Sequence, residues 1–203
     1  MLIGPLILLI LLILTASGWL TGYLNALGLN RSTALAGIAI LIAGRFMGLG
    51  VPVPTPARVL SFNAGTWMLA VLALIVILGP YARQVRRQGL IALLAAGAAA
   101  GGVDRLLPDP PHLAVALPSV YLLAAAAGTT AYLVGRNRTL AVAAAIGGPP
   151  VVNLLQGLIV AISGPDAVAR ISGTLAFDAG ILAAIIAGTL VELVGDQGLR
   201  TGR

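Results

Sequence analysis

Few side chains in this sequence could do chemistry, and one of them stands inside an apolar run. Asp178 lies in LAFDAG (175–180), near the start of a segment apolar enough to cross a bilayer. A lone charge within a membrane costs at least ~2.5–3.5 kcal/mol on insertion scales, so it needs a partner. Arg45 lies in another apolar run, at matching depth if both runs are spans. We therefore expect Asp178 to pair with Arg45 across a helix bundle.

Two amide side chains join this candidate site. Asn63 lies in LSFNAG (60–65), which repeats the phrase around Asp178 with Asn in place of Asp. Asn153 ends the stretch IGGPPVVN (146–153). Counting ~1.5 Å per helical residue places both amides in the same half of the membrane as the ion pair. We expect them to form hydrogen bonds close to it.

The four residues before Val151 predict an irregular helix. They are Gly147, Gly148, Pro149 and Pro150. Proline has no N–H to donate and glycine lowers helix propensity, so a kink or an unwound turn is expected there. Carbonyl groups freed at membrane depth must be buried in protein or face a water-filled cavity. This stretch is thus either the lining of a solute site, as in transporters with broken helices, or a packing kink.

The elements that must position these residues are membrane-spanning helices. The chain has 203 residues, of which 59% are hydrophobic and 9% charged, and its mean hydropathy is +1.05. Ordinary globular domains are about 25% charged, so this composition predicts an integral membrane protein. The chain has no Cys, which excludes disulfides, thiolate metal sites and cysteine nucleophiles.

Seven apolar runs are candidate spans, and the brief polar or Pro-rich connections between them predict a single membrane domain over residues 1–203. The fourth run is the shortest and the most weakly apolar. The N-terminal MLIGP has no basic side chain, so we expect the first run to be a retained helix rather than a cleaved signal peptide. The predicted class is an all-α polytopic bundle. The runs cover about 3–24, 33–50, 61–79, 89–103, 113–135, 139–162 and 173–195.

Arginine placement predicts the orientation of this bundle. The odd-numbered connections and the C-terminal tail share one side and hold eight Arg, whereas the other side holds Arg58, Arg105 and Arg170. The positive-inside rule puts the N-terminus outside and the C-terminus in the cytoplasm. The net charge of +6 is therefore interpreted as topology rather than nucleic-acid binding. The eight are Arg31, Arg83, Arg86, Arg87, Arg136, Arg138, Arg200 and Arg203.

Ordered similarities between the two halves predict an internal repeat. GLNRSTALA (28–36) resembles GRNRTLAVA (135–143), and SFNAG and AFDAG follow them in the same order. Repeat A would cover about 3–79, repeat B about 113–195, and a connector helix about 89–103. Both copies would run in the same direction, with Asn63 and Asp178 at equal depth. Parallel repeats of this kind occur in transporters, with the site at the repeat interface.

Three G-x-x-x-G patterns predict close helix contacts, within one copy or between copies of a homo-oligomer. They lie at 18–22, 44–48 and 97–101.

From about residue 113 onward the chain resembles a prokaryotic multi-pass membrane family, the domain of unknown function 1614. IGGPPVVN (146–153) and RISGTLAFDAGILAAII (170–186) stand where that family has segments like IGADLLN and IGGAGTFDGIFLTGI, and SFNAG is similar to its NxGG segment. The resemblance implies a location in the prokaryotic cell (inner) membrane and brings no known activity. The family's first Asp falls on Pro150 here, so the resemblance leaves Asp178 without a second catalytic carboxylate.

These observations favour transport or binding of a small solute or ion at a polar site in the outer half. Asp178 would be the central charge, able to carry a proton. The alternative is a structural or assembly protein whose Arg–Asp pair only fixes helix register. An intramembrane hydrolase would need a nucleophile or a second acid near Asp178, and the sequence offers none. The expected partners are the lipid bilayer and a small solute or proton, with no nucleic acid, cofactor or metal.

Overall fold

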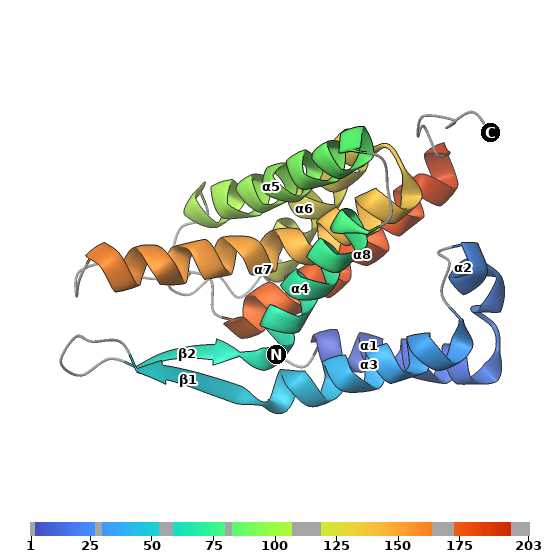
Figure 1. Cartoon of the computed structure of the whole chain (residues 1–203), viewed down its shortest axis with the longest axis horizontal. Helices are drawn as coiled ribbons and strands as arrows, with labels where there is room; N and C mark the ends of the chain where they lie inside the picture. The colour runs from blue at the N-terminus through green and yellow to red at the C-terminus, as the bar shows by residue number, and fades with distance from the viewer. Residues whose placement is uncertain are drawn as a thin grey trace.

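Helices form along the apolar runs of the sequence, and they make up most of the structure (Figure 1). The computed structural model describes residues 3–26, 30–52, 59–79, 83–106, 119–163 and 173–195. The elements are α1 (Ile3–Ser17), α2 (Thr21–Ala26), α3 (Arg31–Phe46), β1 (Gly48–Pro52), β2 (Val59–Asn63), α4 (Ala64–Leu78), α5 (Arg83–Leu106), α6 (Ser119–Gly135), α7 (Arg138–Ser163) and α8 (Gly173–Val194).

Three helices in this described part of the chain are long and apolar enough to cross a membrane. α5 has 24 residues, and α7 and α8 contain apolar segments of 22 and 20 residues. Helices α1, α4 and α6 contain shorter apolar segments, of 10–17 residues. The weakest predicted run, 89–103, lies inside α5, so this helix is among the longest although its sequence signal was the poorest.

The first predicted span, 3–24, is two helices rather than one. Gly18 has a φ of +88°, a left-handed conformation that glycine adopts without steric cost. The last turn of α1 closes there, because the Gly18 N–H donates to the Thr15 carbonyl at 3.1 Å. The chain then turns into the short helix α2, whose direction differs from that of α1 (Figure 1).

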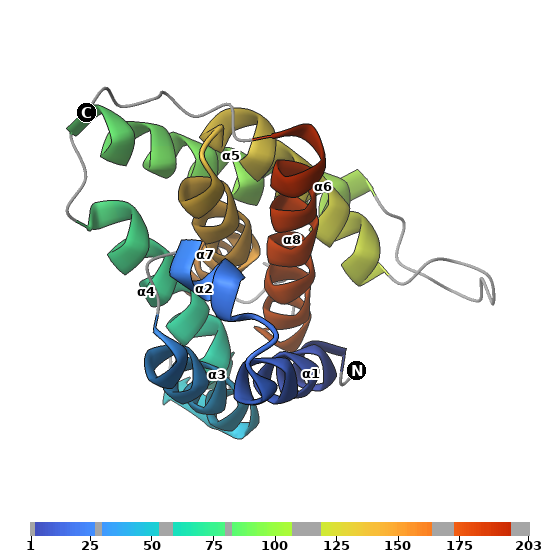
Figure 2. The same cartoon turned by 90° about the vertical axis from the view of Figure 1, so that its right-hand side faces the viewer.

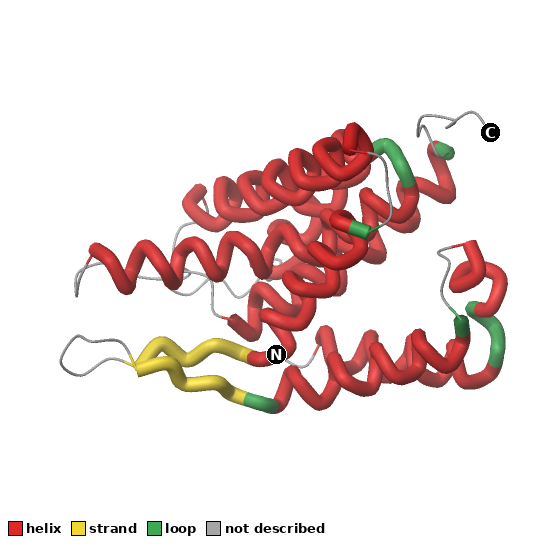
Figure 3. Tube along the Cα trace, viewed as in Figure 1, coloured by secondary structure: helices red, strands yellow, loops and turns green. Residues whose placement is uncertain are grey.

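A β-hairpin joins α3 to α4, which the all-α prediction did not include (Figure 3). β1 and β2 pair antiparallel, with Gly48 opposite Asn63 and Pro52 opposite Val59. Glycine and proline in β1 disfavour continuation of α3, so the helix ends at Phe46 although the sequence stays apolar. Residues 48–50 and 61–63, predicted to lie in spans, are therefore strand.

Helices α4 to α8 pack into one unit, the five-helix body, and α1 and α3 lie beside each other along one side of it (Figures 1 and 2). Small residues fill the core of the five-helix body, so its helices approach closely. A second cluster joins the α1–α3 pair to the body. That cluster consists of Leu8, Leu41, Leu69, Phe177 and Ile181. The alanines of the main core include Ala73, Ala92, Ala96, Ala100, Ala124, Ala127, Ala131, Ala141, Ala144, Ala145, Ala179, Ala183 and Ala187.

The predicted break in α7 is not an unwound turn, because the helix continues from Arg138 to Ser163 with Pro149 and Pro150 inside it. Pro150 cannot donate to the carbonyl of Ile146, four residues earlier. Gly180 of α8 packs against this carbonyl, since a Cβ at Gly180 would lie 2.7 Å from the Ile146 oxygen. The neighbouring helix thus covers the freed oxygen, and no unwinding is needed to bury it.

The two glycines of this stretch also lie in helix contacts. A Cβ at Gly147 would lie 2.5 Å from the Ala73 Cβ on α4, and one at Gly148 would lie 2.9 Å from the Ala96 Cβ on α5. All four residues from 147 to 150 are buried. In the described structure this stretch is the point where α7 packs against α4, α5 and α8.

The repeated G-x-N-R motif has one local role in both places. Asn30 Oδ1 accepts the Thr33 N–H at 2.8 Å and caps α3, while Asn137 Oδ1 accepts the Thr139 N–H at 2.9 Å and caps α7. The second matched phrase lies in different secondary structure in the two halves. Asn63 ends β2 just before α4, whereas Asp178 lies in the second turn of α8.

We predict that Gly180→Ala lowers the free energy of unfolding in detergent by roughly 1–3 kcal/mol, because the added Cβ overlaps the Ile146 oxygen. Thermal or denaturant unfolding followed by helical circular dichroism measures this change. Gly37→Ala on α3 is the matched control, since a Cβ there meets nothing within 4 Å and alanine raises helix propensity. Equal stability of the two variants would contradict the proposed contact.

Candidate functional site

Arg45 and Asp178 lie together where the α1–α3 pair meets the five-helix body. Arg45 is in the last turn of α3. Its Nε atom lies 3.8 Å from Asp178 Oδ1, and the two side chains are 10% and 2% exposed. The pairing predicted from the cost of a lone buried charge is therefore present in the structure.

A backbone group is the second partner of Asp178. The Gly4 N–H donates to Asp178 Oδ1 at 3.2 Å. Gly4 is in the first turn of α1, where backbone N–H groups have no carbonyl partner within the helix and the helix dipole favours a negative charge. A Cβ at Gly4 would lie 2.5 Å from the same oxygen, so only glycine permits this approach.

The aromatic ring before Asp178 covers the guanidinium. Arg45 Cζ lies 5.8 Å from the centroid of the Phe177 ring, within cation–π range, and Phe177 is fully buried. Helix α4 closes the same region, because a Cβ at Gly65 would lie 2.8 Å from Phe177 Cε2 and 2.9 Å from the Arg45 backbone nitrogen. Ends of α1, α3, α4 and α8 thus surround the pair, and Asp178 is 1% exposed.

The other predicted site residues lie around this junction or in α7. The backbone of Asn63 pairs with Gly48 at the end of β2, directly before α4, while its side chain is outside the described part. Asn153 is buried on α7, about one turn beyond Pro150. The stretch 147–150 lies in the helix contacts described above. Arg58 and Arg170, which we placed on the outer side, are outside the described residues.

The chemistry available at the junction is that of a closed ion pair. The carboxylate has a guanidinium and an amide donor as partners, and Phe177 and Gly65 pack over them. Among the described residues no group of three or more His, Cys, Asp or Glu side chains could hold a metal ion. In the described conformation this geometry fixes the ends of α1, α3 and α8 relative to one another.

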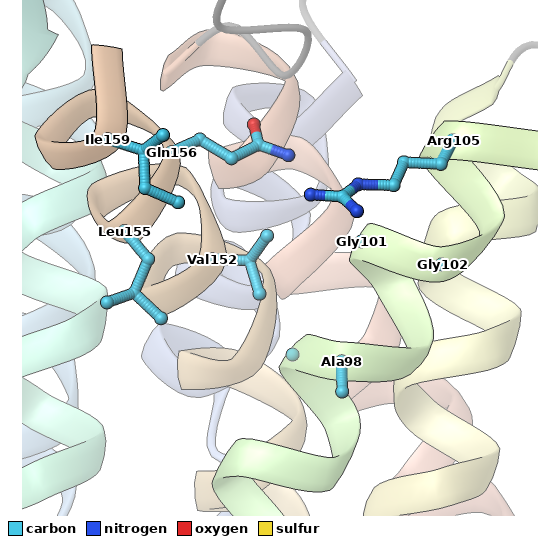
Figure 4. Close-up of a pocket in the computed structure, with 9 residues that line it drawn as sticks. Ala98, Gly101, Gly102, Arg105, Val152, Leu155, Gln156 and Ile159 are labelled. Atoms are coloured by element: carbon cyan, nitrogen blue, oxygen red, sulfur yellow. The ribbon is translucent and has the colours of Figure 1, made fainter. Parts of the chain in front are cut away.

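A hollow that was not predicted from the sequence lies between α5 and α7 (Figure 4). Its volume is about 310 Å³. Arg105 was assigned to a loop, but it belongs to the last turn of α5 and lines this hollow together with Gln156 of α7. The small residues along 97–102, which read GAAAGG, were the available signal. We call this hollow the α5–α7 groove; its remaining lining residues are Gly97, Ala98, Gly101, Gly102, Val152, Leu155 and Ile159.

No protein family, curated protein or solved structure matches the chain. The resemblance to the domain of unknown function 1614 stays a prediction.

We predict that removing one member of the buried pair lowers the free energy of unfolding far more than replacing both members by apolar residues. Arg45→Met or Asp178→Leu leaves one buried charge without its counter-ion, so each is expected to lower the free energy of unfolding in detergent by roughly 3–5 kcal/mol. The double variant removes both charges and is expected to lose less than either single variant. Denaturant unfolding of the four proteins gives the coupling energy.

The matched control is the half-exposed pair of Arg138 and Glu192, whose side chains are 26% and 51% exposed. Its corresponding single variants are expected to cost roughly 0–1 kcal/mol, as for other exposed pairs. Additive losses at Arg45 and Asp178 would show that the two groups do not interact.

Proposed function

We propose that the chain is an integral membrane protein with seven crossing helices, α1 and α3 to α8, and an external N-terminus. Contacts at both ends of the helices support this alternating path. Gly4, Arg45 and Asp178 meet at one end, from the start of α1, the end of α3 and the start of α8. Arg138 at the start of α7 pairs with Glu192 at the end of α8 at the opposite end.

For this membrane protein we propose transport or binding of a small solute or ion, with Asp178 as the central charge. The observation that carries the proposal is the burial of the Arg45–Asp178 pair at the joint between the α1–α3 pair and the five-helix body. Ionisable groups inside membrane helices mark solute and proton pathways by default. Many transporters work by rocking one helix group against another around a site at their interface. Separation at this joint would expose the carboxylate and the guanidinium to a solute.

A purely architectural pair is the second candidate, and one observation favours it. Asp178 is 1% exposed and already accepts the Gly4 N–H, so the described conformation has both partners in place without a solute. In this alternative the pair fixes the register of α1 and α3 on the five-helix body. The two candidates differ in one expectation. Transport requires the Asp178 carboxylate for solute flux even in a variant that folds normally, whereas the architectural role does not.

The flux test uses purified protein in proteoliposomes with a panel of small solutes and a pH-sensitive dye for protons. We expect Asp178→Asn to abolish proton-coupled uptake, because an amide cannot carry the proton while its oxygen can still accept the Gly4 N–H. Glu192→Gln, on the last turns of the same helix, is the matched control and should retain uptake. Unchanged uptake by folded Asp178→Asn would refute the transport proposal. Absence of uptake by the wild type for the whole panel would favour the architectural pair.

The orientation is testable because the chain has no Cys, so an introduced one is unique. Leu106→Cys and Gln84→Cys place exposed thiols at the two ends of α5. An impermeant maleimide is expected to label Leu106→Cys in intact cells and Gln84→Cys only after permeabilisation. The reverse pattern would place the N-terminus in the cytoplasm.

A further inference from the structure

The α5–α7 groove combines an apolar floor with polar groups at one end. Gly97 and Gly101 of α5 contact Val152 of α7, whose Cγ atoms would lie 2.9 Å and 3.1 Å from Cβ atoms added at the two glycines. Leu155 and Ile159 form the outer wall on α7 and are about half exposed. The small residues of α5 therefore leave a furrow that larger side chains of α7 border on one side.

The polar end carries a positive charge. Figure 4 shows the guanidinium of Arg105 and the amide of Gln156 pointing toward one another across the groove. The Arg105 side chain is exposed at this end of the groove. Guanidinium groups bind phosphate oxygens through paired N–H donors, and an amide N–H adds a further donor. The groove thus offers an anion subsite next to an apolar one.

The positions of these groups along α5 match the layers of a bilayer. Arg105 is the second-last residue of α5, and Gly97 lies eight residues earlier, ~12 Å deeper at 1.5 Å per residue. If α5 crosses the membrane, Arg105 lies at the headgroup level and the floor lies among acyl chains. The volume of about 310 Å³ is at the small end of ligand pockets, which suits one acyl chain rather than a whole lipid.

We propose that the α5–α7 groove binds an anionic phospholipid, with one acyl chain against Gly97, Gly101 and Val152 and its phosphate on Arg105 and Gln156. The inference rests on the membrane placement proposed above, but it does not depend on transport at Asp178. Basic positions between membrane helices are a known means of holding lipid headgroups. The lipid would fill the furrow beside the place where Gly97 and Gly101 of α5 contact Val152 of α7.

The test is native mass spectrometry of the full chain in detergent, titrated with phosphatidylglycerol or phosphatidylcholine of the same acyl chains. The wild type is expected to bind phosphatidylglycerol more tightly. Arg105→Gln should weaken phosphatidylglycerol binding about fivefold, from the loss of ~1 kcal/mol per interfacial Arg, and weaken phosphatidylcholine binding less, because the choline cation offsets the charge of its phosphate. Arg86→Gln, an exposed Arg at the other end of α5, is the matched control and should bind like the wild type. Ala98→Phe fills the groove and should weaken both lipids.

Three results would overturn the proposal. Equal losses for Arg86→Gln and Arg105→Gln would mean non-specific attraction to a basic helix. Unchanged binding by folded Ala98→Phe would mean that no acyl chain enters the groove. Displacement of the lipid by glycerol phosphate at equal concentration would mean a site for a free anion. If Ala98→Phe does not fold, the comparison of Arg105→Gln with Arg86→Gln decides whether the lipid binds in the groove. The flux measurement on the wild type tests the transport proposal separately, so failure of one proposal does not imply failure of the other.

Discussion

The structure depends on the requirement that a carboxylate in an apolar helix bundle be neutralised and hydrogen-bonded. Asp178 meets it with one charged side chain and one helix terminus, so three helices must end or begin at the same place. The requirement is strict because the Coulomb attraction of a buried pair only offsets its desolvation when the geometry is maintained. The pair and the cluster of Leu8, Leu41, Leu69, Phe177 and Ile181 beside it together place α1 and α3 on the five-helix body.

Glycine placement makes this junction and the centre of the body possible. Gly4, Gly65 and Gly180 each stand where a Cβ would overlap a neighbouring helix, at an oxygen, an aromatic ring and a carbonyl respectively. Membrane helices gain little from apolar side chains facing one another, because lipid is equally apolar, and close backbone approach replaces that gain. The same contact at Gly180 covers the carbonyl that Pro150 leaves without its usual donor.

Sequence reasoning could predict the Arg45–Asp178 pair, because a lone charge in an apolar run requires a partner whatever the fold. It could also predict the helical class and an α-helix over 89–103, from apolar run lengths. It could not predict the Gly4 donor, since every residue except proline carries a backbone N–H. Nor could it decide between an unwound turn and a covered carbonyl at Pro150. The β-hairpin was not predicted, because residues 48–50 and 61–63 adjoin the apolar runs that form α3 and α4. The expected equivalence of Asn63 and Asp178 was based on the similar sequences SFNAG and AFDAG. Their secondary structure differs because α4 begins after Asn63, whereas α8 begins five residues before Asp178.

The alanine-rich interior of the five-helix body has a consequence for the free energy of folding. Alanine and glycine have no side-chain torsions to fix, so packing them costs almost no rotamer entropy, whereas leucine or methionine would each lose up to ~1–2 kcal/mol. With Ala92, Ala96, Ala127 and Ala183 all fully buried, the interior has few alternative rotamers in which to repack. Movements within α4 to α8 would therefore take place as rigid displacements of whole helices, not as rearrangements of individual side chains.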